Sequence, residues 1–190
     1  MKTELLKILR ESDGYVSGQQ LCERFHVSRT AVWKVIQQLK EEGYEVEAVK
    51  NRGYLLKKDA VPDVMTVPEI ISRLHSRWMG RNCIFLETVD STNNYAKTLS
   101  DLSLPQLVVS EEQTAGRGRL GRSFYSPAGK GIYMSFAFCP RLELSQAMLV
   151  TTMTAVAVCR ALESLTGLRP KIKWVNDIYL NEKKLCGILT

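Results

Sequence analysis

Apolar residues recur at intervals of three and four positions in three short segments near the N-terminus, which predicts three amphipathic helices. The first segment ends near Gly14, and the second opens at Ser17, which forms a capping box with Gln20. The three-residue turn 26–28 leads into the third segment, which ends at Gly43. Two helices joined by so short a turn are typical of the helix-turn-helix motif.

An alternating segment, a glycine-containing turn and a second short strand over residues 44–56 predict a β-hairpin behind the helices. Lys50 and Arg52 lie at its tip, so the hairpin is a basic wing. Residues 1–58 are therefore predicted to form a winged helix-turn-helix domain. The segment 59–68 holds two prolines and little periodicity, which predicts a linker.

The outward face of the third helix is a candidate DNA surface, because a recognition helix presents its N-terminal residues to the major groove. A three-helix module with a hairpin also serves in protein–protein recognition, so that alternative stays open. Capping box, turn length, polar face and basic wing together favour DNA. The candidate DNA-contacting residues are Ser17, Arg29, Thr30, Trp33, Lys34, Gln37, Lys50 and Arg52.

Predicted strands and helices are mixed through residues 69–190, which indicates a second domain of the α+β class. Strands are predicted at 83–89, 107–110 and 132–138, and further short strands near the end of the chain. The long apolar segment 145–165 contains threonines and two charged residues. We therefore expect a helix that a sheet largely covers, and not a membrane span.

The chain has 190 residues, of which 45% are hydrophobic, so it can form one large domain or two smaller ones. Its formal net charge of +6 suits anionic ligands but identifies none of them. Five cysteines without a C-x-x-C pair, and only two histidines, argue against a disulfide framework or a zinc site. We expect a soluble cytoplasmic protein with no membrane partner and no metal site built from protein ligands alone.

Three glycines and three arginines share the seven positions of Gly116–Arg122. Glycine lets backbone N–H groups approach a ligand closely, and arginine matches carboxylate and phosphate oxygens in pairs, so the segment predicts an anion-binding loop. The pattern G-x-G-x-x-G is present, but no helix follows it as a dinucleotide site requires. A P-loop would need lysine at Arg122, and the kinase motifs are missing downstream. A flexible basic surface loop is the remaining alternative.

Three other places in this domain carry polar side chains that can be interpreted in two ways. The turn 90–93 offers hydroxyl and amide groups to a ligand, although simple capping of a helix also explains them. Asp177 beside Asn176 either orients a cation or a ribose, or only forms a turn. Lys184 either extends to solvent or supplies a point charge to an anionic ligand.

Four segments, 90–93, 113–119, 173–177 and 184–189, resemble in order the motifs of the bifunctional biotin-protein ligases that double as biotin operon repressors. The D-S-T-N turn is similar to their biotin-contacting turn, and Q-T-A-G-R-G-R to their adenylate-binding segment. Val175 replaces the proline of K-W-P-N-D, and Cys186 replaces the alanine of K-L-A-G-I-L. The resemblance covers essentially the whole chain.

This resemblance implies a winged helix-turn-helix followed by an SH2-like α+β catalytic domain of the class II synthetase and biotin ligase type, with a mixed sheet. It implies that biotin and ATP, with Mg²⁺, give biotinyl-5′-AMP and pyrophosphate, and that a lysine of a biotin carboxyl carrier protein then takes the biotinyl group from the adenylate. No enzyme nucleophile is needed, so catalysis rests on positioning and charge stabilisation. By resemblance, the catalytic residues are Lys184, Arg119 and Arg117. The expected biotin and biotinyl-AMP contacts are Ser91, Thr92, Asn93, Gln113, Gly116, Arg117, Gly118, Arg119, Asn176, Asp177 and Lys184.

The resemblance further implies repression of biotin synthesis genes at operator DNA, with a homodimer formed when the adenylate is bound. Family members continue past the position of Thr190 with more of the catalytic sheet and a small C-terminal β-barrel. We therefore expect an incomplete catalytic domain in this chain. A second hypothesis is a DNA-binding regulator with impaired catalysis, which senses biotin or a related small anion.

Overall fold

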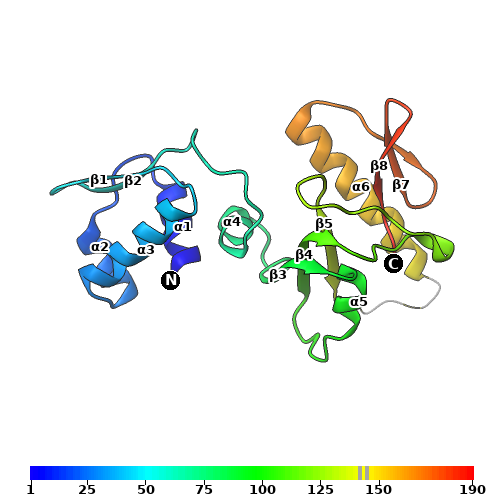
Figure 1. Cartoon of the computed structure of the whole chain (residues 1–190), viewed down its shortest axis with the longest axis horizontal. Helices are drawn as coiled ribbons and strands as arrows, with labels where there is room; N and C mark the ends of the chain where they lie inside the picture. The colour runs from blue at the N-terminus through cyan, green and yellow to red at the C-terminus, as the bar shows by residue number, and fades with distance from the viewer. Residues whose placement is uncertain (141–142, 144–145) are drawn as a thin grey trace.

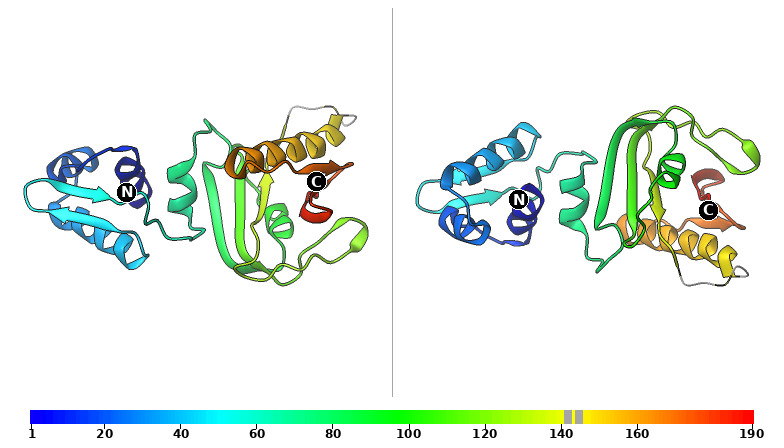
Figure 2. Two further views of the ribbon diagram at one scale, coloured as in Figure 1. Left: turned by 90° about the horizontal axis from the view of Figure 1, so that it is seen from above. Right: turned by 90° about the horizontal axis from the view of Figure 1, so that it is seen from below.

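The computed structural model describes residues 1–140, 143 and 146–190, and the side chains of residues 147 and 148 lie outside that description. An N-terminal winged helix and a C-terminal α+β region lie on opposite sides of helix α4 (Val67–Arg73), as Figures 1 and 2 show. The predicted α+β class with an N-terminal winged helix-turn-helix is thereby confirmed.

Helices α1 (Lys2–Glu11), α2 (Gly18–Phe25) and α3 (Arg29–Glu41) build the N-terminal unit. The Oγ of Ser17 accepts a hydrogen bond from the Gln19 N–H at 3.2 Å, so the predicted N-cap of α2 is confirmed. The bond reaches the second helical N–H group, whereas a capping box would place it on the third.

The turn between α2 and α3 is also as predicted. The Oγ of Ser28 accepts a hydrogen bond from the Ala31 N–H at 3.2 Å, and His26 closes α2 in the left-handed conformation. The apolar stripes of the three helices meet in one core together with the hairpin. The buried members of that core are Leu5, Leu6, Leu9, Leu21, Val32, Val35, Ile36, Leu39, Tyr44, Val46 and Leu56.

Strands β1 (Val46–Val49) and β2 (Gly53–Leu56) pair antiparallel and form the wing. The backbone of Val16, just before α2, exchanges two hydrogen bonds with Tyr54 and so ties the wing to the helices. Gly53 has a φ of +112°, and a Cβ there would lie 2.0 Å from the Val16 carbonyl oxygen, so this junction requires glycine.

Helix α4 begins inside the end of the segment 59–68 that was expected to be a linker, and it packs against α1. The carboxylate of Glu69, which is 7% exposed, holds it there. It accepts hydrogen bonds from the Tyr44 hydroxyl at 2.6 Å, from the Arg73 Nε at 2.5 Å and from the Arg10 guanidinium. A buried carboxylate needs such partners, because an unpaired buried charge is strongly unfavourable.

Strands β3 (Asn82–Val89), β4 (Gln106–Gln113) and β5 (Tyr133–Ala137) form a mixed sheet. β3 and β4 are parallel, helix α5 (Thr92–Lys97) connects them, and β5 pairs antiparallel with β4. Figure 2 shows α4 on one side of this sheet and α5 on the other. The mixed sheet was predicted, and β4 extends three residues further than expected, to Gln113.

Helix α6 (Ala147–Thr166) packs against the small antiparallel sheet of β6 (Lys171–Lys173), β7 (Asp177–Leu180) and β8 (Lys183–Gly187). The helix was predicted from Ser145, a residue that lies outside the described part of the chain.

The expectation that a sheet largely covers α6 is wrong, because only 11% of the segment Leu149–Thr166 is buried. The small sheet contacts the helix, in which Ala155 is fully buried while Met153 and Leu165 are 65% and 84% exposed. By length and composition alone this segment would suffice to cross a membrane, a test that the core helix of a soluble protein also passes.

Candidate functional site

The turn between β3 and α5 is held by a side chain from the end of β4. The Oε1 of Gln113 accepts hydrogen bonds from the Thr92 N–H at 2.9 Å and from the Thr92 hydroxyl at 3.1 Å. Ser91 occupies the N-cap position, but its side chain makes no capping bond. The capping expected of Ser91 or Thr92 therefore comes from Gln113, which brings two of the predicted binding segments into contact.

Gln113 is fixed from its other side by Ser126. Its Nε2 donates to the Ser126 Oγ at 3.0 Å, and the Ser126 hydroxyl donates to the Phe124 carbonyl oxygen at 3.0 Å. Gly116 lies against the same atoms, because a Cβ there would lie 2.4 Å from that carbonyl oxygen and 2.6 Å from the Ser126 Oγ. Position 116, at the base of the arginine–glycine loop, therefore admits only glycine.

The arginine–glycine loop, residues 114–125, leaves the end of β4 and returns beside it. Gly116 and Phe124 are joined by a backbone hydrogen bond of 2.8 Å, and Gly118 and Arg122 by one of 2.7 Å. Inside the loop Arg119–Gly121 forms a single tight turn with Leu120 in the left-handed conformation, so no α-helix follows the glycines. This geometry agrees with the prediction of a loop between strands and with the rejection of a dinucleotide fold.

Arg119 reaches from this loop to the start of β7. Its NH1 donates to the Asn176 Oδ1 at 3.0 Å, and the Asn176 Nδ2 donates to the Asp177 Oδ1 at 2.9 Å. The same oxygen of Asp177 accepts the ammonium of Lys184 at 2.8 Å, with the two side chains 22% and 39% exposed. Lys184 is therefore paired with a carboxylate inside the candidate site and does not simply extend to solvent.

A further bond joins this group to the turn at α5. The Nδ2 of Asn93 donates to the Leu189 carbonyl oxygen at 3.2 Å, just after β8. The four segments singled out in the sequence are thus connected through hydrogen bonds and one ion pair, although they are spread over residues 90–189. One arginine, one lysine and several amides belong to this connected group, which suits a ligand that carries an anionic group and a polar amide-like group.

Asp90 and Arg117 lie at the rim of this group. A hydrogen bond from the Asn94 amide, followed by one from the Ser91 backbone and by the charge of Arg117, lowers the pKa of the Asp90 carboxyl below its ordinary value. Arg117 and Gly118 sit in the loop as predicted, and Arg117 is exposed.

Two serines of the site were missed in the sequence. Ser126 fixes Gln113, and Ser135 on β5 donates a hydrogen bond to the Thr92 Oγ1 at 2.8 Å and contacts the Asn93 Oδ1. Serine in a strand is common, so neither position carried a signal. The one available hint was the alternation along β5, which places Ser135 on the buried face beside Tyr133.

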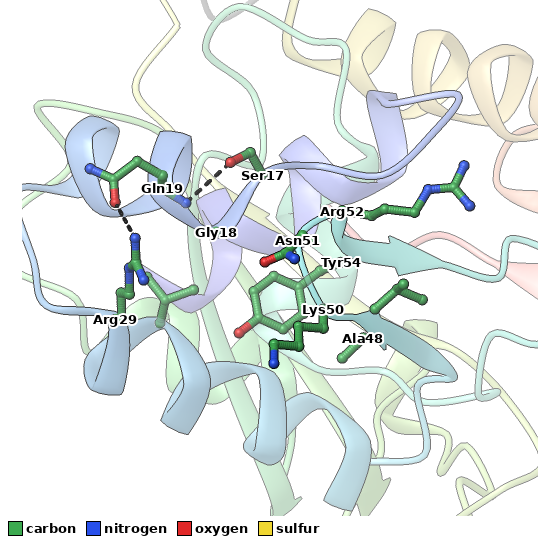
Figure 3. A pocket seen from close by; sticks show the side chains of 12 residues that line it. Ser17, Gly18, Gln19, Arg29, Ala48, Lys50, Asn51, Arg52 and Tyr54 are labelled. Carbon is green, nitrogen blue, oxygen red and sulfur yellow. Dashed lines mark hydrogen bonds between the residues drawn. The ribbon is translucent and has the colours of Figure 1, made fainter.

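The candidate DNA surface contains a groove of about 350 Å³ between the wing and the ends of α2 and α3 (Figure 3). Arg29 donates from its NH2 to the Gln19 Oε1 at 3.0 Å, so the guanidinium is held across the two helices. Figure 3 shows Lys50 and Tyr54 facing the same groove from the wing. Gln19 and Tyr54 were not among the predicted contacts.

The other predicted DNA contacts differ in solvent exposure and in the bonds that their side chains make within the protein. Trp33 is 52% exposed on the outer face of α3, and Thr30 and Lys34 are exposed beside it. Arg52, which also lines the groove, lies over the Tyr15 ring at 4.6 Å. Ser17 uses its hydroxyl oxygen as the cap of α2. Gln37 is half-buried.

Comparison with known families gives the class of the protein. Residues 85–190 match the biotin/lipoate A/B protein ligase family, and residues 2–55 match a helix-turn-helix domain. The first match spans more than half of the chain, so the chain belongs to the biotin/lipoate A/B protein ligase family. The resemblance to biotin-protein ligases stated from the four sequence segments is thereby confirmed.

Particular relatives narrow the comparison. The chain is 39% identical over 193 aligned positions to the bifunctional ligase/repressor BirA of Bacillus spizizenii, covering all of this chain and 59% of that protein. It is 32% identical to BirA of Escherichia coli, over 98% of this chain and 56% of that protein. The chain therefore spans a little over half the length of these relatives.

Solved structures agree with these relatives. Biotin protein ligase from Aquifex aeolicus in complex with biotin and ATP is 40% identical, with a TM-score of 0.50 over 57% of this chain and 46% of that one. The Leishmania major enzyme in complex with biotinyl-5-AMP is 32% identical, with a TM-score of 0.52 over 57% of this chain and 51% of that one.

Proposed function

We propose that the protein containing this chain activates biotin with ATP to biotinyl-5′-AMP, transfers the biotinyl group to a lysine of a carrier protein, and represses biotin synthesis genes when the adenylate is bound. The observation that carries this proposal is the connected group of Arg119, Asn176, Asp177 and Lys184 beside the turn at Thr92. Similarity to ligases bound to biotin and ATP supports it, and does not favour a regulator without ligase activity.

The roles of the cationic residues follow from their chemistry. Lys184 would hold the biotin carboxylate and the α-phosphate region, because an ammonium is a compact point charge. Arg117 and Arg119 would cover the adenylate, since guanidinium groups bind phosphate oxygens in pairs. Catalysis would then consist of holding two reactants in line and stabilising the charge that develops between them.

The polar residues would bind the remaining parts of the ligand. We place the biotin contacts at the turn beside Gln113 and the nucleotide contacts at the start of β7. The assigned residues are Ser91, Thr92, Asn93, Gln113, Gly116 and Gly118 on the biotin side and loop, with Asn176 and Asp177 near the nucleotide.

Magnesium would reach this site with ATP. Within the described residues no three His, Cys, Asp or Glu side chains gather as a metal site, and the Asp177 carboxylate already pairs with Lys184. Mg²⁺ commonly keeps most of its ligands from phosphates and water, with one or two carboxylates from the protein. Asp177 is the residue present that fits such a role.

The partners and organisation belong to the same proposal. The expected division was a DNA-binding domain at 1–58, a linker at 59–68 and a catalytic domain from 69 onward. Because α4 packs against α1 through Glu69, we propose that α4 belongs with the N-terminal unit and that the catalytic domain, acting in the cytoplasm, begins after it. Operator DNA would bind the winged helix, and a biotin carboxyl carrier protein would accept the product. Adenylate binding would favour a homodimer.

Biotin-dependent exchange of pyrophosphate into ATP tests the enzymatic part. We expect exchange by this chain, and Lys184→Gln to lower its rate about 100-fold, because one preorganised charge contributes a factor of that order. Lys183→Gln is the matched control, since the neighbouring lysine is exposed and its removal leaves the Asp177 pair intact. Equal loss in both variants would contradict the role given to Lys184, and no exchange in the unaltered chain would contradict ligase activity.

A further inference from the structure

The small sheet of β6, β7 and β8 has two faces of different chemistry. Ile172, Ile178 and Cys186 lie opposite one another in register on the three strands, and Ile178 is fully buried. Helix α6 packs against β6 and β7, so this row marks the face that the helix covers. Side chains alternate between the faces along a strand, so the residues on either side of that row point away from α6.

The face turned away from α6 carries three lysines. Lys171 pairs in register with Tyr179, and Tyr179 pairs with Lys184, so these three side chains form one row across the strands. Lys173 pairs with Asp177 in the next row. The Lys173 ammonium lies 5.3 Å from the centre of the Tyr179 ring, as expected of two side chains on the same face. The three lysines therefore lie around Tyr179 and Asp177.

Positive charge exceeds negative charge on this face. Asp177 is the one carboxylate among the residues of the three strands, and the Lys184 ammonium already pairs with it at 2.8 Å. In the part of the chain that the structure describes, neither Lys171 nor Lys173 lies within ion-pair distance of an acidic side chain. Both residues are exposed. Two such cations beside a third suit a ligand with several negative charges.

The position of these lysines indicates which part of ATP they can meet. Adjacent strands lie 4.7–4.9 Å apart, so β6 is about 10 Å from β8 and its lysines carry their charges on four-carbon stems. Arg119 bonds to Asn176 at the start of β7, on the other side of Asp177 from Tyr179 in the strand. With the α-phosphate beside Lys184, as proposed above, the next phosphates can lie over Tyr179, between Lys171 and Lys173.

The proposed reaction places new negative charge on those phosphates. A carboxylate oxygen of biotin bonds to the α-phosphorus, and the bond between the α-phosphorus and the oxygen that bridges to the β-phosphate breaks. The electron pair of the broken bond stays on that oxygen, which leaves as part of pyrophosphate. Cations fixed beside the leaving group stabilise this charge as it develops.

We propose that Lys171 and Lys173 form a polyphosphate subsite, which binds the β- and γ-phosphates of ATP and the pyrophosphate that leaves. This rests on the proposed function, because that function supplies ATP. Neither lysine was among the site residues expected from the sequence. Tyr179 is a positioning residue in this subsite, because its ring keeps the Lys173 ammonium on the face that carries Lys184.

Binding of inorganic pyrophosphate to the whole chain, measured by calorimetry, tests the subsite without catalysis. We expect Lys171→Gln and Lys173→Gln each to weaken binding about tenfold, in line with the loss of one charge-assisted contact. Lys183→Gln is the matched control, because Lys183 is exposed and pairs in register with Leu180, on the opposite face of the sheet. An equal loss in the control, or no binding by the unaltered chain, overturns the proposal.

Biotin-dependent exchange of pyrophosphate into ATP then measures the role in the reaction. In both variants we expect the KM for ATP and for pyrophosphate to rise about tenfold while the KM for biotin stays unchanged. Unchanged KM values for ATP and pyrophosphate overturn the inference while the proposed function stands. An effect confined to transfer onto an acidic carrier protein would also overturn it, and would assign this face to that partner. If the expected pattern of pyrophosphate binding appears without any exchange, the subsite stands and the proposed ligase activity fails.

Discussion

At the scale of single residues, Asp177 is the centre of the candidate site. One of its carboxylate oxygens accepts both the Asn176 amide and the Lys184 ammonium. Partly exposed ion pairs are worth about 0–1 kcal/mol, so an anionic ligand can take over the ammonium at little cost. Asp177 therefore orients the Lys184 ammonium but does not prevent it from binding an anionic ligand.

Gly116→Ala should damage the base of the arginine–glycine loop. A Cβ would lie 2.4 Å from the Phe124 carbonyl oxygen, which is backbone and cannot move away cheaply. Overpacking of this kind typically costs about 1–3 kcal/mol. Gly118→Ala is the control for stability, because the nearest atom to its Cβ would be 3.4 Å away. Urea unfolding compares the two, and equal midpoints would contradict the assigned crowding.

The sequence was most informative for residues whose chemistry is unusual in a turn or loop. Arg119 and Asn176 were singled out in this way and Lys184 as a lone charge at the start of a strand, while their roles came from the family resemblance. The structure connects them through Asp177. Ser126 and Ser135 were missed because their role depends on which segments meet, and one residue in a strand does not encode that.

At the scale of elements, α4 could not be predicted from the hydrophobic pattern of the sequence. The helix has seven residues and a proline in its first turn, too short for a periodic signal, so its first residues were taken as linker. The longer helices of the winged helix were predicted correctly because their capping residues and their apolar stripes indicated the same boundaries.

The burial of α6 was predicted wrongly for another reason. The composition of a segment shows that its helix is apolar, but it does not show how much of that helix a sheet covers.

Glu69→Gln should destabilise the N-terminal unit by about 3 kcal/mol. The carboxylate and Arg10 are 10% and 13% exposed, and removing one charge of a buried pair leaves the other uncompensated. Urea unfolding followed by circular dichroism measures the loss. Glu45→Gln is the control, because its pair with Lys57 is more than half exposed on both sides and should matter by less than about 1 kcal/mol. A similar effect of both substitutions would show that burial of Glu69 is unimportant.

Tyr44→Phe should change how stability depends on alkaline pH. Burial, and then the hydrogen bond to Glu69, raise the pKa of Tyr44 above its ordinary value of 10.0. The unfolded chain releases this proton near pH 10 while the folded protein keeps it, so the contribution of Tyr44 is complete below that pH and declines above it. The stability difference between the unaltered protein and Tyr44→Phe should therefore shrink from about pH 9 to about pH 11. A difference that stays constant would contradict the shift.

At the scale of the whole molecule, α4 lies between the winged helix and the mixed sheet and contacts both α1 and β3 (Figure 1). The two matched regions, 2–55 and 85–190, leave α4 in neither. Because α4 contacts both units, it offers a route by which a ligand bound in the C-terminal region affects the winged helix within one chain. The overall order of a DNA-binding module before a ligase domain was predicted from sequence, because each half carries its own local signals.

The proposed DNA surface of the winged helix can be tested with DNA of arbitrary sequence, because contacts to phosphates do not depend on sequence. Binding of a random-sequence duplex, followed by fluorescence anisotropy at several salt concentrations, reports the number of phosphates neutralised, at a slope of about 0.9 per contact. Arg29 and Lys34 are exposed at the start of α3, so replacing both by alanine should weaken binding and reduce the slope by up to about 2. Lys57→Ala removes an exposed charge outside the groove and should leave the slope nearly unchanged. If the control lowers the slope as much as the pair does, the attraction is a property of net charge, and α3 has no special place in the interface.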